Sequence, residues 1–145
     1  MAYRFSYKGR TAIISGDTNK SANIEKFAQG IDLLVHEALN PKMLNAMNQA
    51  ATAAGRPNTA KIFHDVLDYH ATPTEAAETA ETARDTGVGH LLCYHVVPPL
   101  IMPASEAIWL EGVDERFGDY TLGEDGTSIS LPANSSDIVV SSRGL

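Results

Sequence analysis

Four polar side chains stand at the ends of short apolar stretches, and their residue types could carry out hydrolysis. Asp17 follows the run Ala-Ile-Ile in TAIISGDT, and Glu37 follows the apolar stretch of IDLLVHE. His70 lies just before a helix-start signal, and His95 closes the stretch LLCY. In open α/β sheets the carboxyl ends of strands meet at one edge, where such sheets build their sites. We therefore predict that these four side chains form one site.

Asp17 and His95 are the candidates for metal ligands. They offer one carboxylate oxygen and one imidazole nitrogen, a mixed donor set that suits zinc, manganese or iron. A histidine on a rigid strand end is a typical zinc ligand, which makes His95 the strongest single candidate. A catalytic zinc normally takes three protein ligands. Two ligands therefore predict an unfinished metal site.

Glu37 and His70 are the candidates for proton transfer. A carboxylate placed directly after an apolar run is costly to desolvate unless it has a partner, and a histidine would be one. A carboxylate that holds a histidine fixes its tautomer and keeps it available as a proton donor. Asp17 and His70 also have an ordinary structural role open to them: Asp17 could form the Gly-Asp-Thr turn, and His70 could bond to a helix N-terminus. Glu37 is harder to explain in this way.

The remaining candidate groups are expected to be structural. His36 lies next to an apolar run and is predicted to be a satisfied core histidine. His64 lies beside an acidic residue on a helix and is predicted to be solvated, while His90 starts a strand and so lies at the wrong end of the sheet. Cys93, the single cysteine, stands within an apolar stretch and is expected to be a small buried hydrophobe.

Composition limits the kinds of partner. The 145 residues predict one domain, and the formal net charge of −7 argues against a nucleic-acid-binding surface. Only Lys8 and Arg10 lie close together among the basic residues. No apolar run reaches the ~18 residues of a membrane span, and the N-terminus is too polar for a signal peptide. We predict a cytoplasmic protein.

Hydrophobic periodicity predicts an alternation of strands and helices, which is typical of α/β folds. The expected strands are a half-buried strand around Tyr3, Phe5 and Tyr7, then 11–15, 31–35, 91–95, a tail hairpin turning at 124–126, and an edge strand at 138–140. The expected helices lie at 21–29, from Pro41 to Gly55, from Pro57, and from a capping box at Thr72 and Glu75 to Gly87.

Four motifs occur in a family-like order: GDT, IDLLVHEA, a histidine ahead of PTEAA, and LLCYHVVP. From Tyr3 to Leu131 the chain resembles the carboxy-terminal half of the metallo-β-lactamase superfamily, in the branch that holds ribonuclease Z and arylsulfatase- and phosphodiesterase-like hydrolases. The resemblance implies an α/β fold that is half of an αββα sandwich, with a mixed sheet covered by helices on one face.

The resemblance also implies roles for the site residues. Asp17 would bridge two metal ions, which are zinc in the complete fold, and His95 would bind one of them. Manganese or iron is the alternative metal. Glu37 and His70 would form the proton-donating pair.

The chain departs from the family pattern in several places. The family motif His-x-His-x-Asp-His lies upstream of GDT, but no histidine occurs among the 16 residues before Asp17. Ribonuclease Z usually reads HEAT and HST where this chain reads HEAL and HAT, and its last histidine usually precedes Ser-x-Arg rather than VVPP. These departures favour a small-ester hydrolase over transfer-RNA processing.

The expected protein is thus one domain over residues 1–145 that lacks the N-terminal half. The predicted function is metal-dependent hydrolysis of a phosphodiester, sulfate or other ester, with weak metal binding and little or no activity in this chain. A lone sheet with one uncovered face exposes more apolar surface than soluble monomers tolerate, which predicts a homodimer or higher oligomer. The alternatives are a non-catalytic oligomeric module, or a half-enzyme completed by a separate chain.

Overall fold

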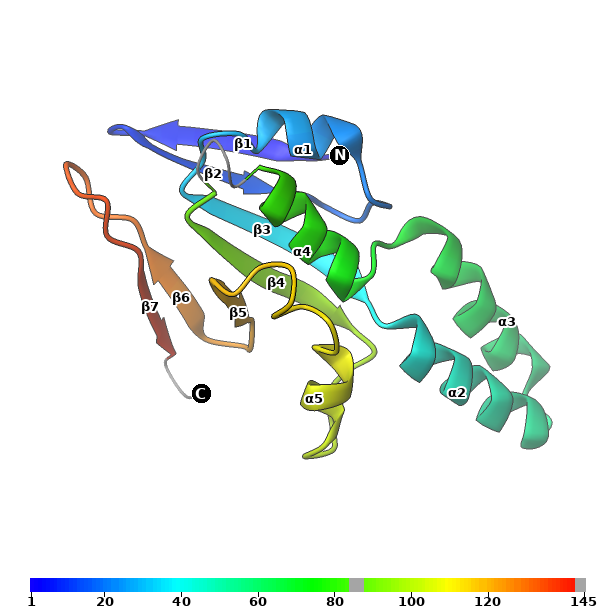
Figure 1. The fold of residues 1–145 in the computed structure, drawn as a ribbon. Helices are drawn as coiled ribbons and strands as arrows, with labels where there is room; N and C mark the ends of the chain where they lie inside the picture. Colours follow the sequence, from blue (N-terminus) through cyan, green and yellow to red (C-terminus); the bar gives the residue numbers. More distant parts are fainter. Residues whose placement is uncertain (84–87, 143–145) are drawn as a thin grey trace.

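The computed structural model describes residues 1–83 and 88–142 (Figure 1). Its centre is a five-stranded sheet in the order β1-β2-β3-β4-β5, in which β1 is antiparallel to β2 and the other neighbours are parallel. The strands are β1 (Tyr3–Tyr7), β2 (Arg10–Ile14), β3 (Leu33–Leu39), β4 (His90–Val97) and β5 (Tyr120–Leu122). The predicted mixed α/β sheet is therefore confirmed.

Two of the helices lie over one face of this sheet, and another pair extends beyond it (Figure 1). The helical elements are α1 (Ala22–Phe27), α2 (Pro41–Ala53), α3 (Pro57–Asp65), the 3-10 turn η1 (Val66–Tyr69), α4 (Pro73–Thr82) and α5 (Ser105–Trp109). Helices α1 and α4 cover the sheet, whereas α2 and α3 pack on each other beyond the end of β3 (Figure 1). None of the helices in the described ranges is long and apolar enough to cross a membrane.

The predicted helix starts follow from side-chain caps. Thr72 and Glu75 form the reciprocal capping box that opens α4, and the Asn40 side chain accepts a hydrogen bond from Met43 N at the start of α2. Helix α4 ends at Thr82. The predicted continuation to Gly87 falls on residues 84–87, which lie outside the described residues.

The core lies between the sheet and α4. The register aligns Ile13, Leu34 and Leu91 in one row across β2, β3 and β4, and each is at most 2% exposed. The facing residues of α4 are alanines, including Ala76 and Ala80, both fully buried. Short side chains let the helix pack closely on the sheet, which brings its N-terminus beside the strand ends.

The opposite face of the sheet is much more exposed. Strand β1 forms where the alternation predicts it, but the expectation that it is half-buried is wrong. Tyr3, Phe5 and Tyr7 are 57%, 54% and 73% exposed, because they point away from α1 and α4 and no helix covers them within the described residues. Alternation identifies which side chains share a face, but it does not establish that another layer covers that face.

The tail differs from its predicted pairing. We expected the turn at 124–126 to join two strands of a hairpin, but β5 pairs parallel to β4, where Gly123 N donates to Cys93 O at 2.8 Å. After the turn, β6 (Thr127–Ser130) pairs instead with β7 (Val139–Ser142) in a separate two-stranded sheet. The predicted strand at 138–140 is thus present in part, as β7, and its partner is β6.

Candidate metal centre

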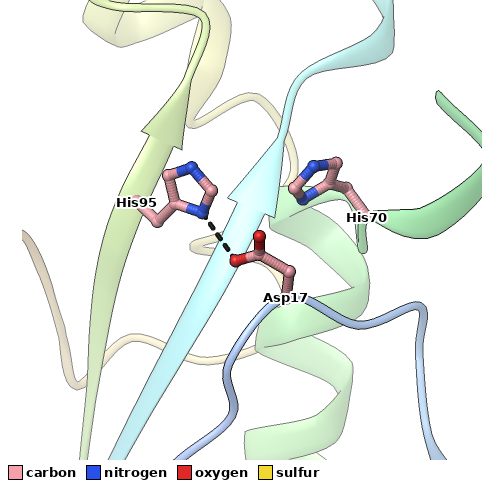
Figure 2. Close-up of side chains that lie close together, drawn as sticks. All are labelled: Asp17, His70 and His95. Atoms are coloured by element: carbon pink, nitrogen blue, oxygen red, sulfur yellow. Dashed lines mark hydrogen bonds and ion pairs between the residues drawn. The ribbon is translucent and has the colours of Figure 1, made fainter. Parts of the chain in front are cut away.

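The carboxyl ends of β2, β3 and β4 lie side by side and bring three of the predicted residues together. Asp17 lies in the loop after β2, His70 in the segment before α4, and His95 in β4, with their side chains turned toward one another (Figure 2). One potential ligand atom from each lies within 4.8 Å of the others. From sequence we paired only Asp17 and His95 as ligands, so the proximity of His70 adds a third donor.

His95 reaches this position through a β-bulge. Glu37 pairs with Tyr94 and Ala38 pairs with Val96, so His95 is the extra residue of β4 and takes a φ of +46°. Our expectation that the strand ends at His95 is wrong, because β4 continues to Val97. Bulges re-aim side chains next to functional sites, and this one places His95 Nδ1 2.8 Å from Asp17 Oδ1.

Glu37 is fully buried and joins the segments that carry the other residues. Its Oε2 lies 2.8 Å from His70 Nδ1, and its Oε1 accepts backbone hydrogen bonds from Thr18 at 3.1 Å and Ala71 at 3.0 Å. These three donors offset the cost of removing a carboxylate from water. Glu37 therefore fixes both the Asp17 loop and the His70 segment, and at 0% exposure it acts through His70.

His70 has one ring nitrogen engaged and one left for chemistry. With Nδ1 on Glu37, its Nε2 is the atom that can bind a metal or transfer a proton. Its side chain is only 6% exposed, and its ring lies edge-on to that of His95, with centroids 5.5 Å apart. A carboxylate behind a histidine is the usual support for a metal-binding imidazole, because it fixes the tautomer and the ring orientation.

The donor set fits a zinc ion. Two imidazole nitrogens and one carboxylate oxygen are borderline and hard donors, and three protein ligands with an open side are typical of catalytic rather than structural zinc. The Asp17 and His95 side chains are 58% and 44% exposed, so water and substrate can reach them. Their mutual hydrogen bond would have to open for both atoms to bind a metal.

Two further residues around the site were missed from the sequence. Ser15 is buried, accepts a hydrogen bond from Glu37 N at 3.1 Å and donates to Gly16 O at 2.8 Å. Tyr94 is opposite Glu37 in the register, and its ring centroid lies 6.4 Å from that of His95. Burial raises the pKa of the Tyr94 phenol, and contacts with Gly16 and Ser15 partly oppose this. Their only sequence signal is adjacency to the GDT loop and to His95.

The other histidines and the cysteine lie outside the cluster. His64 is exposed, and His90 Nε2 bonds Thr121 Oγ1 at 2.8 Å at the other end of β4. His36 is buried as predicted, with Nδ1 2.7 Å from Glu37 O, but its Nε2 has no hydrogen-bond partner among the described residues. The expectation that His36 is fully satisfied is therefore wrong. Burial raises the pKa of Cys93 to about 12, so its thiol is not a nucleophile at neutral pH.

A cavity of about 570 Å³ lies beyond the carboxyl ends of β4 and β5. Val96, the residue after His95, contributes to its wall together with apolar side chains of the segment 100–103. Its other walls carry three carboxylates, from Glu106, Glu124 and Asp125. Among the described residues, no lysine or arginine lines it.

Comparison with solved structures identifies the fold. The metallo-β-lactamase fold protein YhfI from Bacillus subtilis matches 82% of this chain with a TM-score of 0.53 and 18% sequence identity, and the match covers 39% of that protein. The chain therefore has part of a metallo-β-lactamase fold, as the motifs predict. No family model matches the sequence.

Comparison with curated sequences gives a more particular similarity. The chain is 29% identical over 135 residues to the ribonuclease Z of Mycolicibacterium paratuberculosis, and 32% identical over 126 residues to the ribonuclease Z of Mycobacterium sp. strain KMS. These matches cover 93% and 86% of the chain, but only 43% and 39% of the relatives. The predicted partial resemblance to the ribonuclease Z-like branch of the metallo-β-lactamase superfamily is confirmed.

Proposed function

We propose that this chain carries one side of a metal-dependent hydrolase site that cleaves an ester of phosphate, sulfate or a carboxylic acid. The observation that carries the proposal is the cluster of Asp17, His70 and His95, with Glu37 buried behind His70. The partial metallo-β-lactamase fold and the relatives named ribonuclease Z support hydrolysis as the reaction class.

Each residue has a distinct task in this proposal. Asp17 and His95 would hold zinc, with manganese or iron as the alternative, and the metal when bound would supply a Lewis acid and an activated water. His70 would hold a proton at Nε2 for the leaving group, while Glu37 accepts a hydrogen bond from Nδ1 and stabilises the positive charge that forms on the ring. The proximity of His70 to the ligand atoms also makes it a candidate third ligand.

A small ester suits the surroundings of the site better than a polynucleotide. The formal net charge is −7, and in the part of the chain that the structure describes, Glu106, Glu124 and Asp125 line the cavity beyond β4 and β5 without a basic residue. Carboxylates repel a chain of phosphates, whereas a neutral or apolar leaving group would meet the apolar part of the cavity. Substrate choice is thus proposed to differ from what the relatives' name suggests.

The site is proposed to be incomplete within these residues. Three donor atoms suffice for one ion, but a second ion would need ligands from outside the described cluster. We therefore expect weak metal binding and low turnover from this chain alone. A separate polypeptide that supplies further histidines would restore activity, and if none does, the chain is a non-catalytic module.

Metal titration tests the proposal directly. Zinc and manganese binding would be measured by calorimetry on protein purified without chelator, and hydrolysis with bis(p-nitrophenyl) phosphate and p-nitrophenyl sulfate. We expect zinc binding that is lost in Asp17→Asn and kept in the control His64→Ala, whose histidine is exposed on α3. Zinc binding that survives Asp17→Asn would reject the site, and a tightly bound pair of ions would reject its incompleteness.

A further inference from the structure

The cavity beyond β4 and β5 begins next to the candidate metal centre. Its volume of about 570 Å³ is within the range of roughly 300–1,000 Å³ that is typical of pockets for small molecules. Val96 forms part of its wall and directly follows His95, whose side chain points toward Asp17 (Figure 2). A substrate held at the metal centre can therefore extend into this cavity.

One wall of the cavity is apolar. Its side chains are those of Val96, Leu100, Ile101, Met102, Pro103 and Leu122. Ile101 and Met102 are 89% and 68% exposed, so this wall meets water in the absence of a ligand. A ligand with a hydrocarbon part would remove this apolar surface from water, which favours binding.

The other walls carry carboxylates that have no cationic partner. They belong to Glu106, Glu124 and Asp125. Within residues 1–83 and 88–142, none of the three pairs with a lysine or an arginine. By contrast, Glu111 pairs with Lys42 at 2.9 Å. The negative charge at the cavity is therefore available to a ligand.

The turn after β5 is anchored to β4. Gly123 N donates to Cys93 O at 2.8 Å, and a Cβ on Gly123 would lie only 2.7 Å from the same oxygen. The absence of a side chain thus lets this turn pack against the strand. Thr127 then holds the turn, because its Oγ1 accepts from Glu124 N and its N–H donates to Glu124 O, both at 2.9 Å. These contacts fix the backbone that carries Glu124 and Asp125.

Helix α5 anchors the third carboxylate to the same strand. Trp109 is fully buried, and its Nε1 donates to Val97 O at 3.1 Å. Glu106 lies one turn earlier in this helix. All three carboxylates therefore extend from backbone that is fixed to the end of β4, so a ligand does not have to order these segments when it binds.

The combination of walls distinguishes between ligands by charge. Three carboxylates would repel a phosphate or carboxylate group. A hydrated metal ion would leave the apolar wall without a contact, and an uncharged group would gain little from the carboxylates. An organic cation with a protonated amine on a hydrocarbon body would contact both kinds of wall, with the ammonium group donating charge-assisted hydrogen bonds to the carboxylates.

We propose that this cavity binds the cationic part of the substrate, and that the substrates are small esters that carry a protonated amine. The inference rests on the proposed hydrolase function and names its substrate class. The ester group would lie at the metal centre and the amine in the cavity, where no bond forms or breaks. Glu106, Glu124 and Asp125 are then specificity-determining residues.

Benzylamine, benzyl alcohol and benzoate test the charge preference, because they share a ring and differ in charge at neutral pH. Binding to the full chain without added metal would be followed by NMR titration of the protein. Three exposed ammonium–carboxylate contacts of roughly twofold each predict that benzylamine binds about eightfold more tightly than benzyl alcohol. Benzoate should not bind, and the shifts caused by benzylamine should include Val96 and Leu122.

The variant Glu124→Gln/Asp125→Asn removes two of the cavity carboxylates. It should weaken benzylamine binding about fourfold and leave benzyl alcohol binding unchanged. Glu111→Gln/Glu115→Gln is the matched control, because it removes the same charge from exposed residues that do not line the cavity. The NMR spectra also show whether both variants fold.

Each outcome decides the proposal. A preference for benzylamine that falls in the cavity variant and persists in the control supports it. Equal binding of the amine and the alcohol, no binding in the millimolar range, or a preference that survives Glu124→Gln/Asp125→Asn would overturn it.

The titration also separates this proposal from the hydrolase function. Zinc binding without an amine preference would reject the cation site and leave the hydrolase in place. An amine preference in a chain that binds no zinc would reject the hydrolase, and with it the assignment of the amine to a substrate.

Discussion

Two histidine–carboxylate pairs at the candidate site have the same spacing and opposite surroundings. His70 Nδ1 lies 2.8 Å from Glu37 Oε2, and His95 Nδ1 lies 2.8 Å from Asp17 Oδ1. The first pair has exposures of 6% and 0%, the second of 44% and 58%. Distance alone therefore does not describe what the pairs do.

Because their surroundings differ, the two pairs have different functions. Glu37 has backbone donors from two separate segments, so opening this pair would leave buried groups without partners. The Asp17–His95 pair faces water, where such contacts contribute about 0–1 kcal/mol and can be exchanged for contacts with a cation. The buried pair holds the site together, and the exposed pair is available for binding.

Removing Glu37 should have the largest effect. Glu37→Ala leaves Thr18 N and Ala71 N unsatisfied and His70 without support, which should lower the free energy of unfolding by about 3–5 kcal/mol. Urea unfolding followed by circular dichroism measures this. Asp17→Ala is the matched carboxylate control and should change stability by less than about 1 kcal/mol. Equal losses in the two variants would mean that burial does not separate the pairs.

Zinc should act through the exposed pair. A ligand that binds only the folded state stabilises it by RT ln(1 + [L]/Kd), or about 1.4 kcal/mol at tenfold excess over Kd. We expect this rise in unfolding free energy for the natural sequence and its loss in His95→Ala. His90→Ala is the control, because His90 lies at the other end of the same strand. A zinc effect that persists in His95→Ala would place the metal elsewhere.

Substitutions of His95, the extra residue of the bulge, should change stability by an intermediate amount. Its φ of +46° is strained for any residue with a Cβ but not for glycine. His95→Gly should therefore be more stable than His95→Ala by about 1 kcal/mol, while both lose zinc binding. Thermal and urea unfolding of the two variants measure the difference. Equal stability would show that the bulge carries no strain.

The sequence was sufficient for the parts of the structure that depend on local pattern. The capping box of Thr72 and Glu75, the Asn40 cap and the order of strands and helices follow from short-range rules, and all are observed. The pairing of Glu37 with His70 could be proposed because a carboxylate after an apolar run needs a partner. These inferences depend on chemistry that a few neighbouring residues define.

The features that could not be predicted from the sequence depend on strand register and on which layers cover the sheet. The bulge that turns His95 toward Asp17 arises from the pairing of β4 with β3, which no pattern within β4 reveals. The exposure of Phe5 depends on whether a second layer lies over the sheet. The alternating residue pattern of β1 would be the same with or without that layer. The partner of β6 likewise depended on the path of the tail rather than on its apolar residues.

The last predicted effect concerns pH and comes from His36, beside the buried pair. Burial is the main reason that the pKa of His36 is lowered in the folded protein, and its bond to the Glu37 carbonyl and the nearby Glu37 and Glu75 carboxylates only partly oppose this. The unfolded state, with a histidine pKa of about 6.5, therefore binds more protons in mild acid than the folded state. His36 accordingly lowers stability as pH falls below about 6.5 and has no such effect well above it.

Urea unfolding between pH 5 and pH 8 tests whether His36, next to the buried Glu37, lowers stability in acid. A single group contributes a slope of at most about 1.4 kcal/mol per pH unit. His36→Asn can still donate to the Glu37 carbonyl but does not titrate, so its stability should fall less steeply in acid than that of the natural sequence. His64→Asn removes an exposed histidine and should leave the slope unchanged. If the two variants had the same slope, acid sensitivity would not arise beside Glu37, and the buried pair would differ from the exposed one in its contacts but not in its response to protons.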